Sequence, residues 1–152
     1  VVTISSTIST VADSIAGLTI TGVTIKDIDQ IPDSARMLTP LLIPQPANFV
    51  TNLGIEFKTF GSNGGAKIDT SYTLNYVFLF CEVGSGLGSF AAFSGLVTKL
   101  MTILNAINSN DAITGAVDIK IGSIGNIGVI TDPAGNEFWG LEFSLRVLEY
   151  TQ

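Results

Sequence analysis

The sequence predicts an α+β fold, in which a mainly antiparallel sheet of about five to six strands packs with two helices in a single domain, residues 1–152. Two segments carry apolar residues at helical spacing, and the segments between them show either the two-residue alternation of strands or short apolar runs. The strands come in runs around single helices. This order is typical of α+β proteins and differs from the regular strand–helix alternation of parallel sheets.

The first third of the chain predicts one helix and two short strands. Apolar residues recur every three or four positions over 4–18, which predicts an amphipathic helix. We expect Gly17 to end it in the left-handed conformation that glycine adopts at helix C-termini. A strand is expected over Ile20–Ile28. The segment Gln30–Pro46 is rich in proline, which cannot donate to a strand ladder, so we expect a surface connection there around a short buried strand, Leu41–Ile43.

The middle of the chain carries the strongest signals. Thr70–Glu82 alternates aromatic or apolar residues with polar ones and becomes apolar on both faces in its second half, which predicts a central strand. The glycine-rich loop Gly61–Lys67 joins it to a preceding strand around Ile55–Thr59, and we expect a hairpin whose tip meets a neighbouring subunit. After a break at Gly84–Ser89, the spacing of apolar residues predicts a second helix over Phe90–Ile107.

The last third predicts further strands. Val117–Ile121 is a short strand candidate, and the glycine-dotted stretch Gly122–Val129 follows it. A turn is expected at Asp132–Asn136, because proline, glycine and asparagine gather there. The closing strand Phe138–Tyr150 has one apolar and one half-polar face, which favours an antiparallel strand with one side solvated or facing a partner.

The composition favours a protein that buries part of its exterior in an assembly. The sequence is 46% hydrophobic and only 13% charged, against about 25% charged in an average soluble domain. Uncharged surface is often buried against partners, although a monomer with a Ser/Thr/Asn surface is the alternative. The net charge is −6 and the basic residues are scattered, which argues against sequence-specific DNA binding.

The residue inventory argues against an enzyme. The chain has no histidine and one cysteine, which excludes Ser-His-Asp and Cys-His catalysis and the usual zinc sites, so we expect no cofactor and no metal. Asp27 and Asp29 would share one strand face, where they could bind Ca²⁺ or act as an acid–base pair. Solvated charge is the preferred interpretation of this pair. The run Gly84–Gly88 lacks the Walker and dinucleotide patterns, so we interpret it as a turn.

No run of the sequence approaches 18 continuous apolar residues, and the first residues lack the order of a signal peptide. We therefore expect cytosolic synthesis and no membrane partner.

The order of these elements is similar to that of a known protein family. Its parts are the opening helix Thr3–Ala16, the proline-interrupted segment Ile31–Pro46, the aromatic strand Tyr72–Glu82, the helix Phe90–Ile107 and the closing strand Phe138–Tyr150. In this order the chain resembles the tail-terminator (tail-completion) proteins of long-tailed bacteriophages. The resemblance implies a virion structural protein of the tail or neck. Such a subunit forms a homo-hexameric ring that caps the tail tube and joins it to the head–tail connector, and DNA passes through without specific binding. The family brings no catalytic residues.

Four other roles stay open: a tail tube subunit, a head-completion subunit, a small-ligand-binding domain and an enzyme that uses carboxylates alone. We expect subunit or partner contacts at loop and edge positions, namely Phe60, Asn63, Lys67, Ile31, Arg36 and Pro133. The excess of thirteen acids over seven bases suggests an acidic channel wall that repels phosphate, although it could serve only solubility. The expected channel-facing acids are Asp27, Asp29, Asp33 and Asp111.

Overall fold

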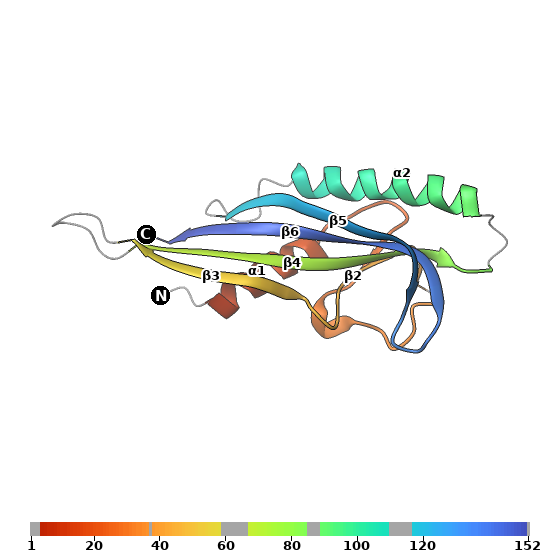
Figure 1. The fold of residues 1–152 in the computed structure, drawn as a ribbon, viewed down its shortest axis with the longest axis horizontal. Coiled ribbons are helices and arrows are strands. Elements are labelled where there is room, and N and C mark those ends of the chain that lie inside the picture. Colours follow the sequence, from red (N-terminus) through yellow and green to blue (C-terminus); the bar gives the residue numbers. More distant parts are fainter. Residues whose placement is uncertain (1–3, 37, 59–66, 85–88, 110–116, 152) are drawn as a thin grey trace.

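A six-stranded sheet with two helices forms the described part of the chain, which comprises residues 4–36, 38–58, 67–84, 89–109 and 117–151 of this computed structural model (Figure 1). The elements in chain order are α1 (Ile4–Ala16), β1 (Thr24–Ile25), the 3₁₀ helix η1 (Ile28–Gln30), β2 (Leu41–Pro44), β3 (Val50–Lys58), β4 (Lys67–Glu82), α2 (Ser89–Asn108), β5 (Val117–Thr131) and β6 (Glu137–Thr151).

The sheet is mainly antiparallel, which confirms the predicted α+β class. Its strand order is β1-β2-β4-β6-β5, and β3 also pairs with β4. The strands β2 and β3 share one edge of β4, since β2 pairs with residues 76–79 and β3 with residues 67–74. Only the short β1–β2 pair is parallel. The strands β4 and β6 pair along almost their whole lengths and form the centre of the sheet.

The larger hydrophobic core lies where both helices pack on one face of the sheet. On the sheet side it contains Tyr72, Leu74, Tyr76 and Phe78 of β4 with Leu141, Phe143, Leu145 and Val147 of β6. These residues alternate along each strand and face one another in the β4–β6 register, so their side chains share one face. The helices contribute Val11, Ile15, Leu96, Leu100, Ile103, Leu104 and Ile107, which recur at the predicted helical spacing.

A smaller core covers part of the opposite face. Val77 and Leu79, the alternate residues of β4, pack there with Phe138 of β6. The segment between η1 and β2 contributes the buried Ala35, and β2 contributes Leu41 and Ile43. Burial on both faces explains why the second half of β4 is apolar throughout, as predicted for a central strand.

Three local predictions about the backbone are wrong. Gly17 does not take a left-handed conformation. Its amide still donates to the Asp13 carbonyl at 2.9 Å, as in a helix, and the Leu18 amide donates to the Ile15 carbonyl in a tighter turn. The strand expected over 20–28 shrinks to Thr24–Ile25, since Gly22 turns the chain with φ 76°. The last third holds two long strands, because 117–131 is one continuous strand with two bulges.

Candidate interaction surfaces

Among the described strands, β5 is an open edge of the sheet, and it carries a row of apolar residues. Ile119, Ile121, Ile124, Ile127 and Val129 lie opposite Val147, Leu145, Phe143, Leu141 and Trp139 of β6, in that order. Four of these β6 residues are buried in the larger core, so the row continues the apolar face of the sheet beyond it. Two bulges, between Ile121 and Ser123 and between Ile124 and Ile127, keep the row on that face.

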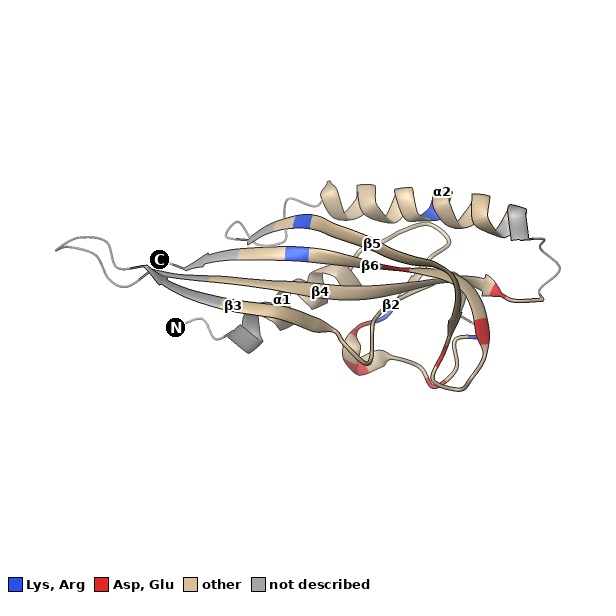
Figure 2. Ribbon diagram, viewed as in Figure 1, with Lys and Arg blue, Asp and Glu red and all other residues tan. Residues whose placement is uncertain are grey.

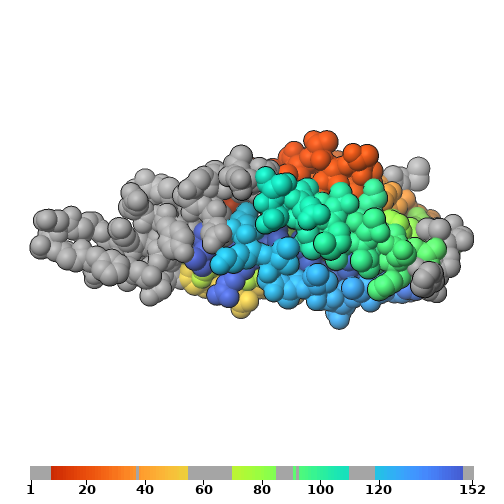
Figure 3. Space-filling model, turned by 90° about the horizontal axis from the view of Figure 1, so that it is seen from above, coloured from red at the N-terminus to blue at the C-terminus, as the bar shows by residue number. Residues whose placement is uncertain are grey.

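Most of this row is open to solvent. Ile121, Ile124 and Ile127 are between 43% and 46% exposed, and Val129 is 51% exposed. The helix α2 lies beside β5 and adds Phe93 and Met101, so that six of the nine large exposed hydrophobic residues in the described part of the chain belong to these two elements. Figure 3 looks onto α2 and β5 at the surface. We name the six residues the β5–α2 patch.

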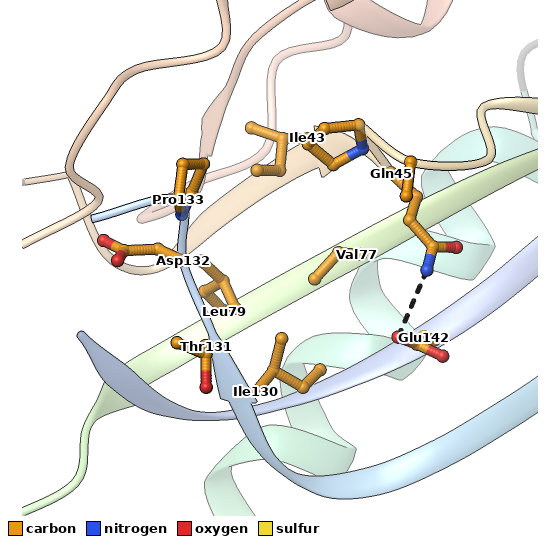
Figure 4. A pocket seen from close by; sticks show the side chains of 11 residues that line it. Ile43, Gln45, Val77, Leu79, Ile130, Thr131, Asp132, Pro133 and Glu142 are labelled. Carbon is orange, nitrogen blue, oxygen red and sulfur yellow. Dashed lines mark hydrogen bonds between the residues drawn. The ribbon is translucent and has the colours of Figure 1, made fainter. Parts of the chain in front are cut away.

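An open pocket lies on the opposite face, beside the turn between β5 and β6 (Figure 4). Its volume is about 270 Å³. Val77 and Leu79 of β4 form part of its wall, and Glu142 accepts a hydrogen bond from Gln45 Nε2 at 3.4 Å. Its lining is completed by Ile43, Pro46, Ala47, Ile130, Thr131, Asp132 and Pro133. The pocket is therefore mainly apolar with two acidic residues, and Pro133, a predicted contact residue, lies in its wall.

Asp132 fixes the turn that borders this pocket. Its carboxylate accepts from the backbone amide of Ala35 at 2.9 Å and from that of Asn136 at 2.8 Å. Burial acts to raise the pKa of the Asp132 carboxyl, but the hydrogen bonds from Ala35, Asn136 and Ala134 outweigh it and hold the pKa below its usual range. The turn between β5 and β6 is thereby tied to the segment before β2, 97 residues away in the sequence.

Asp27 lies in a different setting from the one predicted. It is only 8% exposed and caps η1, where its Oδ1 accepts from the Ile28 amide at 2.6 Å. The Gln30 side chain accepts in return from the Asp27 amide, which completes a capping box. Burial, followed by a hydrogen bond with the Asp13 carboxyl of α1, raises the pKa of Asp27. The expectation of an exposed, channel-facing acid is wrong for Asp27, because the chain turns into η1 instead of continuing as a strand.

We expect the variant Asp27→Asn to gain stability relative to the wild type as the pH rises from 4 to 7. The folded chain binds the Asp27 proton more tightly than the unfolded chain does, so this group contributes stability at low pH that is lost as the pH rises through its raised pKa. Asparagine keeps the cap without the charge. Urea unfolding of both proteins at several pH values measures the effect. The control Asp29→Asn removes the same charge from an exposed position, and an equal gain there would attribute the effect to net charge.

Four other predicted residues lie in the same connecting segment. Asp29 and Asp33 are exposed, as the channel hypothesis requires, but they do not share a strand face with Asp27. Ile31 is half-buried against the smaller core. Arg36 forms an ion pair with Glu82 at 3.4 Å, and the Arg36 side chain is 63% exposed, so the pair is worth at most about 1 kcal/mol. Ile31 and Arg36 thus have partners within the chain.

The structure does not test the residues predicted at the hairpin tip. It confirms the antiparallel β3–β4 hairpin as far as the pair Lys58 and Lys67. Phe60 and Asn63 lie outside the described residues, as do Asp111 and the core of the glycine run, 85–88. Lys67 is placed as the first residue of β4, and nothing further is described of its side chain.

The described charges are unevenly distributed over the molecule (Figure 2). Most of the acidic residues gather toward the end of the sheet that holds the pocket, and blue bands on β5 and β6 mark basic residues nearer the other end. These bands correspond to Lys120 and Arg146, which lie opposite each other in the β5–β6 register.

Within the described part of the chain, no three His, Cys, Asp or Glu side chains gather in a group that could hold a metal ion. Neither of its two helices combines the length and the apolar content that crossing a membrane requires.

Comparison with known proteins adds no relative. A scan against protein families finds none that matches the chain, and a search of curated proteins finds no significant match.

Proposed function

We propose that the chain is a virion structural subunit that assembles with copies of itself into a ring. The role is the one that the resemblance to tail-terminator proteins implies: the ring caps the tail tube, meets the head–tail connector, and lets DNA pass through. The observation that carries the proposal is that two unlike features, which would serve as different contact surfaces, lie at opposite ends of the sheet. These surfaces are the β3–β4 hairpin and the pocket beside the β5–β6 turn.

The hairpin is an arm that extends beyond both helices (Figure 1). In the β4–β6 register, Ile68 meets Thr151 at the end of the sheet that bears the arm, and Glu82 meets Phe138 at the end that bears the pocket. Two unlike surfaces at opposite ends permit head-to-tail contacts, and such contacts generate a closed ring when the rotation between neighbours closes. The β3–β4 end of one subunit would then contact the pocket end of the next.

The size of the pocket favours a side chain of a neighbouring subunit over a free ligand. Ligand pockets usually enclose about 300–1,000 Å³, and this pocket, at about 270 Å³, is below that range and open to solvent. A small-ligand-binding domain therefore remains the weaker alternative. A tail tube or head-completion subunit would use the same head-to-tail contacts, and differs only in its position in the virion.

The acidic wall proposed for the channel now rests on Asp29 and Asp33. Both are exposed and follow the cap of η1 closely in sequence. A negative wall would repel DNA phosphates and so would limit adhesion during passage. Cryo-electron microscopy of the assembled neck tests this role and the position of the ring. A channel lined mainly by Lys and Arg, or density for the subunit along the whole tube, would contradict the tail-terminator role.

We expect the variant Thr131→Trp to lose head-to-tail assembly. Thr131 is an exposed residue of the pocket wall, and an indole at this position would fill the space that a neighbour needs. Native mass spectrometry at concentrations where the wild type assembles measures the subunit number. The control Ala134→Trp adds the same side chain to an exposed position on the same turn that does not line the pocket. Equal assembly by both variants and the wild type would refute the pocket as the contact.

A further inference from the structure

The apolar row on β5 has a spacing that is symmetric about its centre. Its members Ile119, Ile121, Ile124, Ile127 and Val129 are separated by two, three, three and two positions. Each three-residue step contains one register shift, so one shift lies on either side of Ile124. Read from either end, the row therefore presents the same sequence of steps along its outer edge.

This symmetry makes β5 complementary to itself in the antiparallel direction. If Ile124 lies opposite Ile124 of a second copy, each member of the row meets another β-branched residue. Ile121 then faces Ile127 and Ile119 faces Val129, and the same pairs recur with the copies exchanged. Such cross-strand pairs of β-branched side chains stabilise sheets. Like charges stay apart in this register, because Lys120 falls opposite Gly128 of the second copy.

The bulges fit this pairing. In the antiparallel register about Ile124, the step that contains one bulge lies opposite the step that contains the other, so both copies have the same number of residues between paired members of the row. A regular strand can pair with the row only through register shifts, as β6 does on the other edge of β5.

The helix α2 enlarges the surface that such a contact would bury. Phe93, Val97 and Met101 follow at four-residue intervals and so form a stripe along one flank of the helix. Lys99, on the other flank, donates from its Nζ to the Thr21 carbonyl at 3.0 Å in the connection that follows α1. The stripe thus faces the β5 side, and both Phe93 and Met101 are more than half exposed. A stable interface buries about 800 Å² on each partner, which needs such contributions beside the strand.

We infer that β5 pairs edge to edge with β5 of a second copy about a two-fold axis at Ile124, and that the β5–α2 patch is buried in this contact. The pairing satisfies the backbone groups of the open edge and prevents other strands from adding to it. An isologous contact cannot join neighbours around a cyclic ring, so it is separate from the pocket contact proposed above. The two proposals can therefore fail independently.

Disulfide cross-linking tests the register directly. In a Cys81→Ser background, Ile124→Cys places two thiols opposite each other, at the Cα separation of about 4.5–5.5 Å found across antiparallel pairs, which suits a disulfide. Oxidised glutathione should convert most of this variant to a covalent dimer. Ile121→Cys and Ile127→Cys should each give little dimer alone and several-fold more when mixed, because residue 121 meets residue 127 of the other copy.

Two controls complete the experiment. Ala134→Cys, at an exposed position in the β5–β6 turn outside the apolar row, measures the cross-linking that follows from random collision. Ile124→Lys brings two positive charges together on the axis and should abolish the dimer in light scattering, while circular dichroism shows that the fold is kept. Cross-linking of Ile124→Cys at the level of Ala134→Cys would overturn the inference, as would equal yields from the single and mixed variants.

Discussion

The variant Phe78→Ala is expected to lower the free energy of unfolding by about 3–5 kcal/mol, the usual range for removing a buried phenyl ring. Phe78 has no exposed surface and lies in the middle of β4, opposite Leu42 of β2 and Leu141 of β6. Its side chain belongs to the core that both helices share with the sheet, so the cavity would open where three layers of side chains meet. Urea unfolding followed by circular dichroism measures the loss.

A matched variant, Phe93→Ala, removes the same ring from the surface of α2. Phe93 is 53% exposed, so less apolar area returns to water and no closed cavity forms. We expect its unfolding free energy to fall by less than about 1 kcal/mol, within the range of surface substitutions, and the two-fold contact to weaken. Equal losses of stability from the two variants would show that the core does not lie where the structure places it.

The variant Gly140→Ala is expected to cost about 1–3 kcal/mol, although it adds a single methyl group. A Cβ atom at this position would overlap the backbone carbonyl oxygen of Phe78 on the neighbouring strand. It would also press on Ile130 Cδ1 at 3.2 Å and Leu79 Cδ2 at 3.4 Å. Because backbone cannot move aside as a flexible side chain can, the β4–β6 pair must separate locally. Thermal unfolding compared with the wild type measures the cost.

Gly128→Ala provides the control for this substitution. Gly128 lies directly opposite Gly140 in the β5–β6 register, yet a Cβ atom there would meet nothing within 4 Å. We expect a change within about 0.5 kcal/mol. A loss at Gly128 as large as that at Gly140 would point to glycine-specific backbone demands in this part of the sheet, instead of the overlap with Phe78.

The fold class could be predicted because the strongest patterns coincide with complete burial. Along β4, the alternation of Tyr72, Leu74 and Tyr76 with polar residues marks one buried face, and it becomes burial on both faces at Val77. The second helix was predicted within one residue at either end, since its apolar spacing continues without interruption to Ile107. In both cases one short-range period determines which side faces the core.

The remaining features depend on contacts that no short-range period encodes. Asp27 looked like a strand residue, but the capping box with Gln30 competes with strand formation and turns the chain. Gly17 has helical hydrogen bonds, because nothing at that position requires the left-handed conformation. The pocket joins residues from β2, β4 and β6 that are far apart in sequence, so only Pro133 of its wall was predicted as a contact residue.

The apolar row on β5 was not predicted, for a related reason. Steps of three residues at Ile121–Ile124 and Ile124–Ile127 fit neither the strand period of two nor a continuous helical pattern. The strand candidate was therefore ended at Ile121, before the glycine-dotted stretch Gly122–Val129. Only the register against β6 shows that bulges absorb the extra residues and keep the isoleucines on one face.

The pairing of β4 with β6 has a consequence for how the chain folds. It joins residues 67–82 to residues 137–151, so α2 and β5 must both be synthesised before the centre of the sheet can close. Bringing such distant segments together costs a large loop-closure entropy before any contact between them stabilises the chain. Proteins dominated by such long-range pairings fold in milliseconds to seconds. Until then the two hairpins, β3–β4 and β5–β6, expose unpaired edges to other chains. Slow refolding that competes with aggregation at high protein concentration is therefore built into this topology.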